Sequence, residues 1–299
     1  METGVELKSK IWQRITYLLS GLSVIDWRTN VSATSKLKIN LVTESKCMIM
    51  KSSKTEKPPL DTSSIDKYLA QSFFADEQEL LEYKQEVYES NFIDELRERA
   101  EEFGKTTVGH SFRNYAYELA DIGIEQGLYL YSIIRKLKPE TAVETGVCNG
   151  FSTAFLLLAL AKNYKGKLYS LDFPEVAGVN YEDGVFWEGK RGAVIPEDKT
   201  PGWVIPENLK SRWELTLGRS QEKLSELLRR LENIDFFLHD SEHSYECMWF
   251  ECNEAYKVLR DGGMIVFDDI SWNQAFQNFA KEKDKQIVNI GDNLGFFIK

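Results

Sequence analysis

The 299-residue sequence predicts a doubly wound α/β fold, with a mostly parallel seven-stranded sheet and helices on both of its faces. After Pro139 the hydrophobic pattern alternates between short apolar strands and longer helical stretches, which indicates parallel strands joined by right-handed crossovers. The chain then ends in two strand-like segments around a tight turn at residues 291–293. A hairpin at that point would add an antiparallel strand to the sheet.

Each predicted element follows from its own residues. Five short apolar runs, each followed by a helical pattern or a turn, are the predicted parallel strands, and the hairpin supplies two more. The strands are expected at residues 141–147, 167–173, 213–218, 234–239, 263–267, 286–290 and 295–299. Helices are expected at 151–163 and 221–231, with two more that end near Leu259 and Lys283.

The sequence before Pro139 predicts a helical region preceded by a basic segment. Residues 1–60 hold ten Lys and Arg against five Asp and Glu, and residues 61–138 place apolar side chains at helical spacing. Helices are expected at 66–74, 76–102 and 116–137, the second capped by Asp76 with Glu79 as the other half of a capping box. Residues 139–299 would form the sheet domain.

A long insertion interrupts the sheet domain between its second and third strands. The segment 174–211 is much longer than the two to six residues that are usual for such a connection. Tyr181, Trp187 and Trp203, together with three prolines, indicate an ordered flap. We expect this flap to cover the active site as a lid together with the N-terminal helices. The alternative is an interface or a packed surface excursion.

Composition excludes several classes of protein. With 42% hydrophobic and 12% aromatic residues the chain is neither disordered nor fibrous. Its net charge of −10 argues against nucleic acid as the main partner. The longest apolar run, 154–161, is far shorter than the roughly 20 residues of a membrane span, and without a secretory leader the expected compartment is the cytoplasm. Four cysteines with no C-x-x-C pair are expected to be reduced thiols.

The first two predicted strands end in residues that suit a nucleoside ligand. Gly146 and Gly150 at a strand-to-helix turn let a ligand approach the backbone where a helix N-terminus offers free N–H groups. Asp172 ends the second strand, where an acid commonly accepts ribose hydroxyls. Cys148 occupies the second glycine position of the dinucleotide fingerprint, which disfavours a pyrophosphate. An ordinary tight turn and a solvated acid are the alternatives.

The fourth and fifth predicted strands bring three carboxylates to one rim of the sheet. Asp240 follows the fourth strand, and Asp268 and Asp269 follow the fifth. Such acids repel one another unless they are protonated or neutralised, and their oxygens suit Mg²⁺, Mn²⁺ or Ca²⁺. They could instead cap a helix or bind backbone. His243, on the same rim, could be a general base, a metal ligand or a hydrogen-bonded core histidine.

These motifs resemble the class I S-adenosylmethionine-dependent methyltransferases. The resemblance is greatest to a subgroup whose fourth strand ends in the pattern D-x-[DE]-H-S-Y-E, here residues 240–246, and it covers residues 137–299. It implies a Rossmann-like sheet, with Asp172 at the cofactor ribose and Ser220 near the adenine. Asp240 would lie at the junction of cofactor and substrate. The methionine end would be held by Glu144, Gly146, Asn149, Gly150 and Ser152.

The resemblance also implies a reaction. Sugar and catechol-type O-methyltransferases bind Mg²⁺ through acids at positions like Asp240, Asp268 and Asp269, so methyl transfer to an oxygen of a small molecule or sugar is expected. The catechol type has Asn in place of Asp269 and a lysine near the fourth strand that is not found here. A catechol acceptor is therefore not expected. His243 would take the acceptor proton and, with Asp240, form the catalytic pair.

Two other functions stay open at this stage. A nicotinamide-dependent oxidoreductase uses a similar sheet, although the interrupted glycine pattern and the terminal hairpin disfavour it. A non-catalytic binding protein could retain a methyltransferase fold, because fold alone does not define activity. The expected partner is a small-molecule acceptor, and the helices before Pro139 leave homo-oligomerisation open.

Overall fold

The computed structural model describes residues 64–104, 113–176, 194–291 and 293–299, all within one compact unit, Thr55–Lys299. The predicted basic segment 1–60 and residues 177–193 of the insertion lie outside the described residues. No helix in the described ranges is long and apolar enough to cross a membrane.

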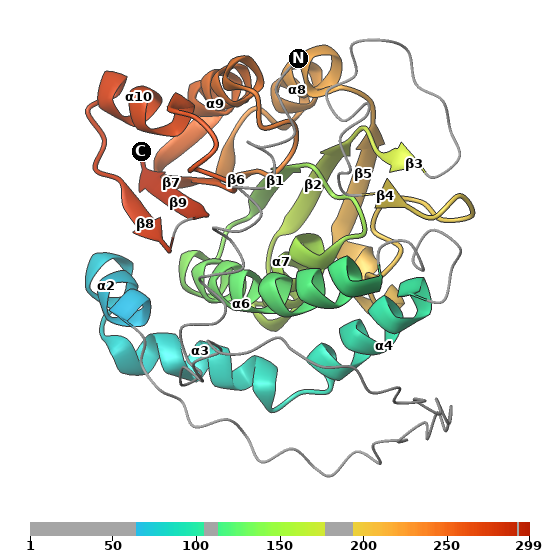
Figure 1. Ribbon diagram of the computed structural model, residues 1–299. Helices are drawn as coiled ribbons and strands as arrows, with labels where there is room; N and C mark the ends of the chain where they lie inside the picture. Colours follow the sequence, from blue (N-terminus) through green and yellow to red (C-terminus); the bar gives the residue numbers. More distant parts are fainter. Residues whose placement is uncertain (1–63, 105–112, 177–193, 292) are drawn as a thin grey trace, which may run out of the picture. The chain divides into compact units, whose positions relative to one another are not determined.

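The central sheet has seven strands in the order β5-β2-β1-β6-β7-β9-β8 (Figure 1). The pairs from β5 through β7 are parallel, whereas β9 is antiparallel to both β7 and β8. The predicted fold, including its terminal hairpin, is confirmed. Strand order reverses between β1 and β6, the point where such sheets bind ligands. The strands are β1 (Thr141–Thr145), β2 (Lys167–Asp172), β5 (Trp213–Leu217), β6 (Ile234–His239), β7 (Leu259–Phe267), β8 (Val288–Ile290) and β9 (Leu294–Ile298).

Helices cover both faces of the sheet. Figure 1 shows α6 and α7 on one face, and α8, α9 and α10 on the other. Side chains of the strands alternate between the two layers, so that Phe236 joins the core under α7 while Phe237 joins the core under α9. The five helices are α6 (Arg113–Leu137), α7 (Phe151–Lys162), α8 (Ser220–Leu231), α9 (Tyr245–Val258) and α10 (Ala275–Glu282).

Three further helices, α2 (Ser64–Phe73), α3 (Glu77–Tyr88) and α4 (Phe92–Gly104), precede α6, and α3 and α4 pack against it. The prediction of one helix over 76–102 is wrong, because the chain breaks after Tyr88. Ser90 accounts for the break. Its Oγ donates to the Val87 carbonyl at the end of α3 and accepts from the Phe92 N–H at the start of α4. The predicted cap at Asp76 is confirmed by its hydrogen bond from the Glu79 N–H, 3.0 Å.

The described part of the insertion packs on the turn after β1. Strands β3 (Glu175–Val176) and β4 (Val194–Ile195) form a small parallel pair, and the 3₁₀ helix η1 (Glu207–Arg212) leads into β5. Between them, the Gly202 N–H donates to the Cys148 carbonyl and the Val204 N–H to the Asn149 carbonyl. Residues 201–205 therefore brace the glycine turn, and the lid hypothesis for 174–211 stays a prediction.

Candidate functional site

The glycine turn after β1 passes directly against the end of β6. Gly146 has a left-handed φ of 85°, and a Cβ on it would lie 2.0 Å from the Asp240 carbonyl oxygen. Gly150, also left-handed at φ 98°, caps the N-terminus of α7. Only glycine fits such close backbone contact. The predicted cofactor turn and the predicted carboxylate rim are therefore neighbours in space.

Replacing Gly146 with Ala should lower the free energy of unfolding. The left-handed backbone alone costs about 1–2 kcal/mol for an L-residue, and the clash with Asp240 adds to that cost. Gly262→Ala is the matched control, because Gly262 has φ 78° but a Cβ on it would meet nothing within 4 Å. Chemical denaturation should give a larger loss for Gly146→Ala than for Gly262→Ala. Equal losses would contradict the close approach.

Asp172 lies at the end of β2 with an unused acceptor. It is 7% exposed, and its Oδ1 accepts from the Val147 N–H of the glycine turn at 3.2 Å. Its Oδ2 is buried and has no partner, and burial raises the pKa of Asp172 to about 6. A buried carboxylate oxygen without a partner needs a donor, and a hydroxyl is a donor of the expected kind.

Two predicted cofactor side chains are held within the fold. Glu144 is fully buried: its Oε2 accepts from Thr153 and Ser170, its Oε1 has no partner, and burial raises its pKa to about 8. Asn149 Oδ1 accepts from the Trp203 indole N–H at 2.6 Å. These contacts hold the side chains of Glu144 and Asn149 in place beside the glycine turn.

Ser152 and Ser220, two further predicted cofactor residues, contact different neighbours. Ser152 Oγ reaches Asp240 Oδ2 at 3.4 Å and joins the glycine turn to the carboxylates. Ser220, at the start of α8, is buried and its Oγ lies 3.5 Å from Cys247 Sγ. Ser152 thus contacts the carboxylate rim through its side chain, as Gly146 does through its backbone.

A three-residue cluster at the ends of β6 and β7 could hold a metal ion. One ligand atom each from Asp240, His243 and Asp268 lies within 4.8 Å of the others. Burial, followed by the Asp268 charge, raises the pKa of Asp240 well above its ordinary value, and burial also raises the pKa of Asp268. Two adjacent, partly buried carboxyls would be stabilised by a cation. The predicted third ligand, Asp269, has its Oδ2 3.7 Å from His243 Nδ1.

His243 is chemically suited to ligation in this position. Burial, and then the neighbouring His239, lower the pKa of His243 to about 3, so that its imidazole is neutral at neutral pH. Its Nε2 is buried without a hydrogen-bond partner. A neutral imidazole nitrogen is a common metal ligand, whereas so low a pKa makes a weak general base.

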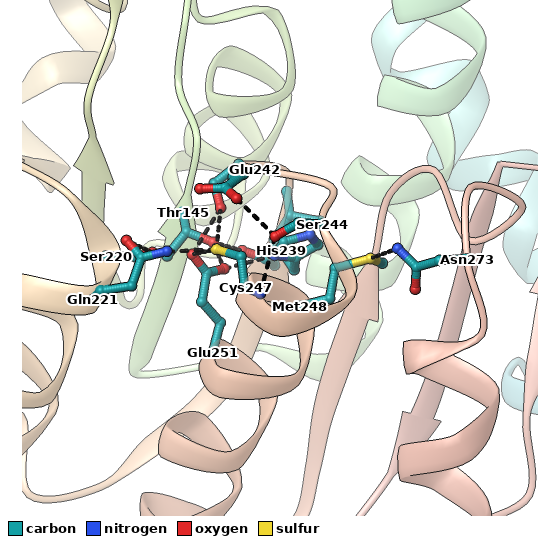
Figure 2. Close-up of polar contacts among 12 residues, drawn as sticks. Thr145, Ser220, Gln221, His239, Glu242, Ser244, Cys247, Met248, Glu251 and Asn273 are labelled. Atoms are coloured by element: carbon teal, nitrogen blue, oxygen red, sulfur yellow. Dashed lines mark hydrogen bonds and ion pairs between the residues drawn. The ribbon is translucent and has the colours of Figure 1, made fainter. Parts of the chain in front are cut away.

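A buried acid beneath the rim was missed in the sequence. Glu251 of α9 accepts from His239 Nδ1 at 2.6 Å, from Thr145 Oγ1 at 2.5 Å and from Ser241 Oγ at 2.7 Å (Figure 2). It is fully buried. The available signal was its place four residues after Cys247 on the apolar stripe of a helix, where an acid requires buried partners.

One comparison with known protein families matches part of the sheet domain. A family model described as a methyltransferase domain matches residues 143–270, less than half of the chain but including the glycine turn and all three predicted rim acids. This match supports a methyltransferase domain in that stretch. A search of curated proteins gave no match.

Three solved structures are distantly similar to the chain. The O-methyltransferase NovP is 15% identical with a TM-score of 0.44, over 59% of this chain and 80% of that one. An O-methyltransferase from Bacillus cereus in complex with SAH is 13% identical with a TM-score of 0.44, over 79% and 98%. An SAH-bound methyltransferase from Podospora anserina is 13% identical with a TM-score of 0.39, over 58% and 77%.

Proposed function

We propose that this protein transfers a methyl group from S-adenosylmethionine to an oxygen of a small molecule or sugar, assisted by a divalent cation. The observation that carries the proposal is the contact between two features: the glycine turn after β1 and the Asp240, His243 and Asp268 cluster. A site for a nucleoside cofactor thus borders a site for a cation. The match of residues 143–270 to a methyltransferase domain supports the same function.

The residues around the glycine turn fit the cofactor. Asp172 Oδ2, buried and without a partner, would accept from the ribose hydroxyls. The turn itself is braced by Trp203 through Asn149, which keeps its backbone in place before any ligand arrives. Ser220 would lie near the adenine, and Glu144 with Ser152 near the methionine end.

The rim residues fit a divalent cation. Asp240 and Asp268 would supply carboxylate oxygens, and His243 would supply a neutral nitrogen. Asp269, the third acid predicted from the sequence, lies next to His243. A donor set of oxygens with one nitrogen suits Mg²⁺ or Mn²⁺ better than a structural zinc. The mutual proximity of the acids is then explained by charge compensation.

For this reaction the protein has to align the reacting atoms and assist removal of the proton from the acceptor hydroxyl. S-adenosylmethionine carries an already activated methyl group, and a divalent cation, when bound, lowers the pKa of an acceptor hydroxyl. The chain holds the cofactor through Asp172 and the glycine turn, and orients the acceptor at the rim beside Asp240. Holding the reacting atoms in line supplies a large share of such a rate enhancement.

Calorimetric titration of the full chain with S-adenosylhomocysteine, with and without Mg²⁺, tests the proposal. We expect binding that Mg²⁺ strengthens. Binding of NADH in place of S-adenosylhomocysteine would instead support the oxidoreductase. Binding of S-adenosylhomocysteine that is unaffected by either Mg²⁺ or Mn²⁺ would overturn the cation site while leaving the cofactor site.

Asp172→Ala should weaken S-adenosylhomocysteine binding by about 10- to 100-fold, the usual cost of losing hydrogen bonds to a charged group. Asp235→Ala is a matched control. Asp235 accepts from the Glu140 and Thr141 N–H groups, and so holds the opposite end of β1 as Asp172 holds the turn. If both variants lost affinity equally, the loss would be structural and Asp172 would not bind the ribose.

A further inference from the structure

A pocket of about 280 Å³ is lined by residues of α2, of α6 and of the segment where β8 ends and β9 begins. Its walls include the apolar side chains of Ile65, Ile290 and Leu294 and the ring of Tyr129. This volume is slightly below the usual range for small-molecule pockets, so it suits one ring of a larger ligand.

The polar part of the pocket is negatively charged. Glu125 lines it, and no lysine or arginine is found among the described lining residues. The buried cation nearest to the Tyr129 ring, Lys84, is already paired with Asp66, which also accepts from the Tyr129 hydroxyl. Among the described residues, Lys84 is thus already paired, and the pocket lining offers no cation to an anionic group placed beside Glu125.

The pocket borders the carboxylate rim. Gln126 lines it and also places its Nε2 3.5 Å from Asp268 Oδ1. On the other wall, Asn293 lines it and accepts through its carbonyl from the N–H of Ile270, two residues after Asp268. A ligand that fills the pocket therefore has one end next to the proposed reacting centre.

We propose that this pocket binds a ring of the methyl acceptor that carries a positively charged amino group. The ammonium group lies against Glu125, and the apolar face of the ring lies against Ile65, Ile290 and Leu294. This deepens, and rests on, the proposed methyl transfer, because it selects the acceptor of that reaction. It assigns Glu125 as a specificity-determining residue outside the cofactor and cation sites.

Three probes with the same ring and different charges test the proposal: cyclohexylamine, cyclohexanol and cyclohexanecarboxylate. Their dissociation constants from the full chain are measured by ligand-detected NMR near pH 7. We expect the amine to bind tightest and the carboxylate weakest. Glu125→Gln should weaken amine binding by about two- to fivefold, the effect of one solvent-accessible charge pair, and Glu125→Lys should reverse the order of amine and carboxylate.

Glu226→Lys is the control for net charge, because Glu226 is exposed on α8, on the opposite face of the sheet. It should leave the order of the three probes unchanged. The same order in wild type and Glu125→Lys, or no measurable amine binding, would overturn the proposal. Parallel titration with S-adenosylhomocysteine separates the two ideas: its binding should be equal in wild type and Glu125→Lys, and its absence in wild type would refute the methyl transfer, not the amine preference.

Discussion

Asp268→Asn should remove divalent-cation binding and at the same time make the metal-free protein more stable. Asp240 and Asp268 are adjacent, partly buried carboxyls whose pKa values are both raised, which means that the fold opposes their ionisation. An asparagine keeps the shape and removes one of the two charges. A gain of about 1 kcal/mol would appear as a rise of about 2–4 °C in Tm for a chain of this size.

The pH dependence of this gain has a definite sign. A carboxyl whose pKa is raised in the folded state destabilises the fold at pH values above its ordinary pKa, because the unfolded chain ionises more easily. With EDTA present, the variant should therefore exceed wild type in Tm at pH 7, and the difference should shrink as pH falls toward about 4 and be absent below it. At acidic pH both side chains are protonated in both states.

Cation binding provides the second readout for Asp268→Asn. Manganese titration followed by electron paramagnetic resonance should show at least a tenfold loss, about the smallest loss seen when residues supporting a metal site are removed. Asp261→Asn is the control, because Asp261 lies exposed on the same strand, β7. A variant that bound Mn²⁺ as wild type does, or that was less stable at pH 7, would contradict the charge-compensation argument.

The sequence carries strong information about the sheet and about where its strands end. Apolar residues that alternate with polar ones, or that follow one another without interruption, predict β1, β2, β6 and β7. Parallel strands present their carboxyl ends at one rim of the sheet. The meeting of Asp240 with Asp268 follows from that geometry alone, since β6 and β7 are neighbours. The nearness of Gly146 to Asp240 follows likewise, because β1 is the other neighbour of β6.

What could not be predicted depends on contacts between segments distant in sequence. The Trp203 to Asn149 hydrogen bond joins the insertion to the glycine turn, and no periodicity encodes it. The break after Tyr88 depends on one serine hydroxyl within a pattern that otherwise continues as a helix. The strand ends place His243 on the same rim, but they do not determine which side chains there group together. In the structure His243 joins Asp240 and Asp268.

Glu251→Gln should destabilise the protein by about 3 kcal/mol, the upper end of the cost of losing hydrogen bonds to a charged group. Burial alone would raise the pKa of Glu251 above 4.5, but His239 and the surrounding hydroxyls lower it to about 2. Thr145, His239, Ser241 and Cys247 all offer donors to its two oxygens. Because an amide has only one acceptor oxygen, a glutamine cannot accept hydrogen bonds from all of these donors.

The lowered pKa of Glu251 determines the pH range over which Glu251→Gln loses stability. Glu251 stabilises the fold at pH values above its ordinary 4.5, and this stabilisation disappears as pH falls toward about 2. Denaturant curves for wild type and Glu251→Gln should therefore differ most near neutral pH and converge below pH 4.5. Glu254→Gln, one turn away in the same helix and bonded to Ser225 and Lys257 near the surface, should cost less than about 1 kcal/mol.

Glu251 should also influence the cation site without touching it. It holds His239 and Ser241, the two residues on either side of Asp240, so its carboxylate fixes the backbone from which Asp240 projects. We expect Glu251→Gln to weaken Mn²⁺ binding by about tenfold, as loss of a supporting residue commonly does. A purely structural role would lower stability and leave the Mn²⁺ affinity of the folded protein unchanged, and that result would refute the positioning role.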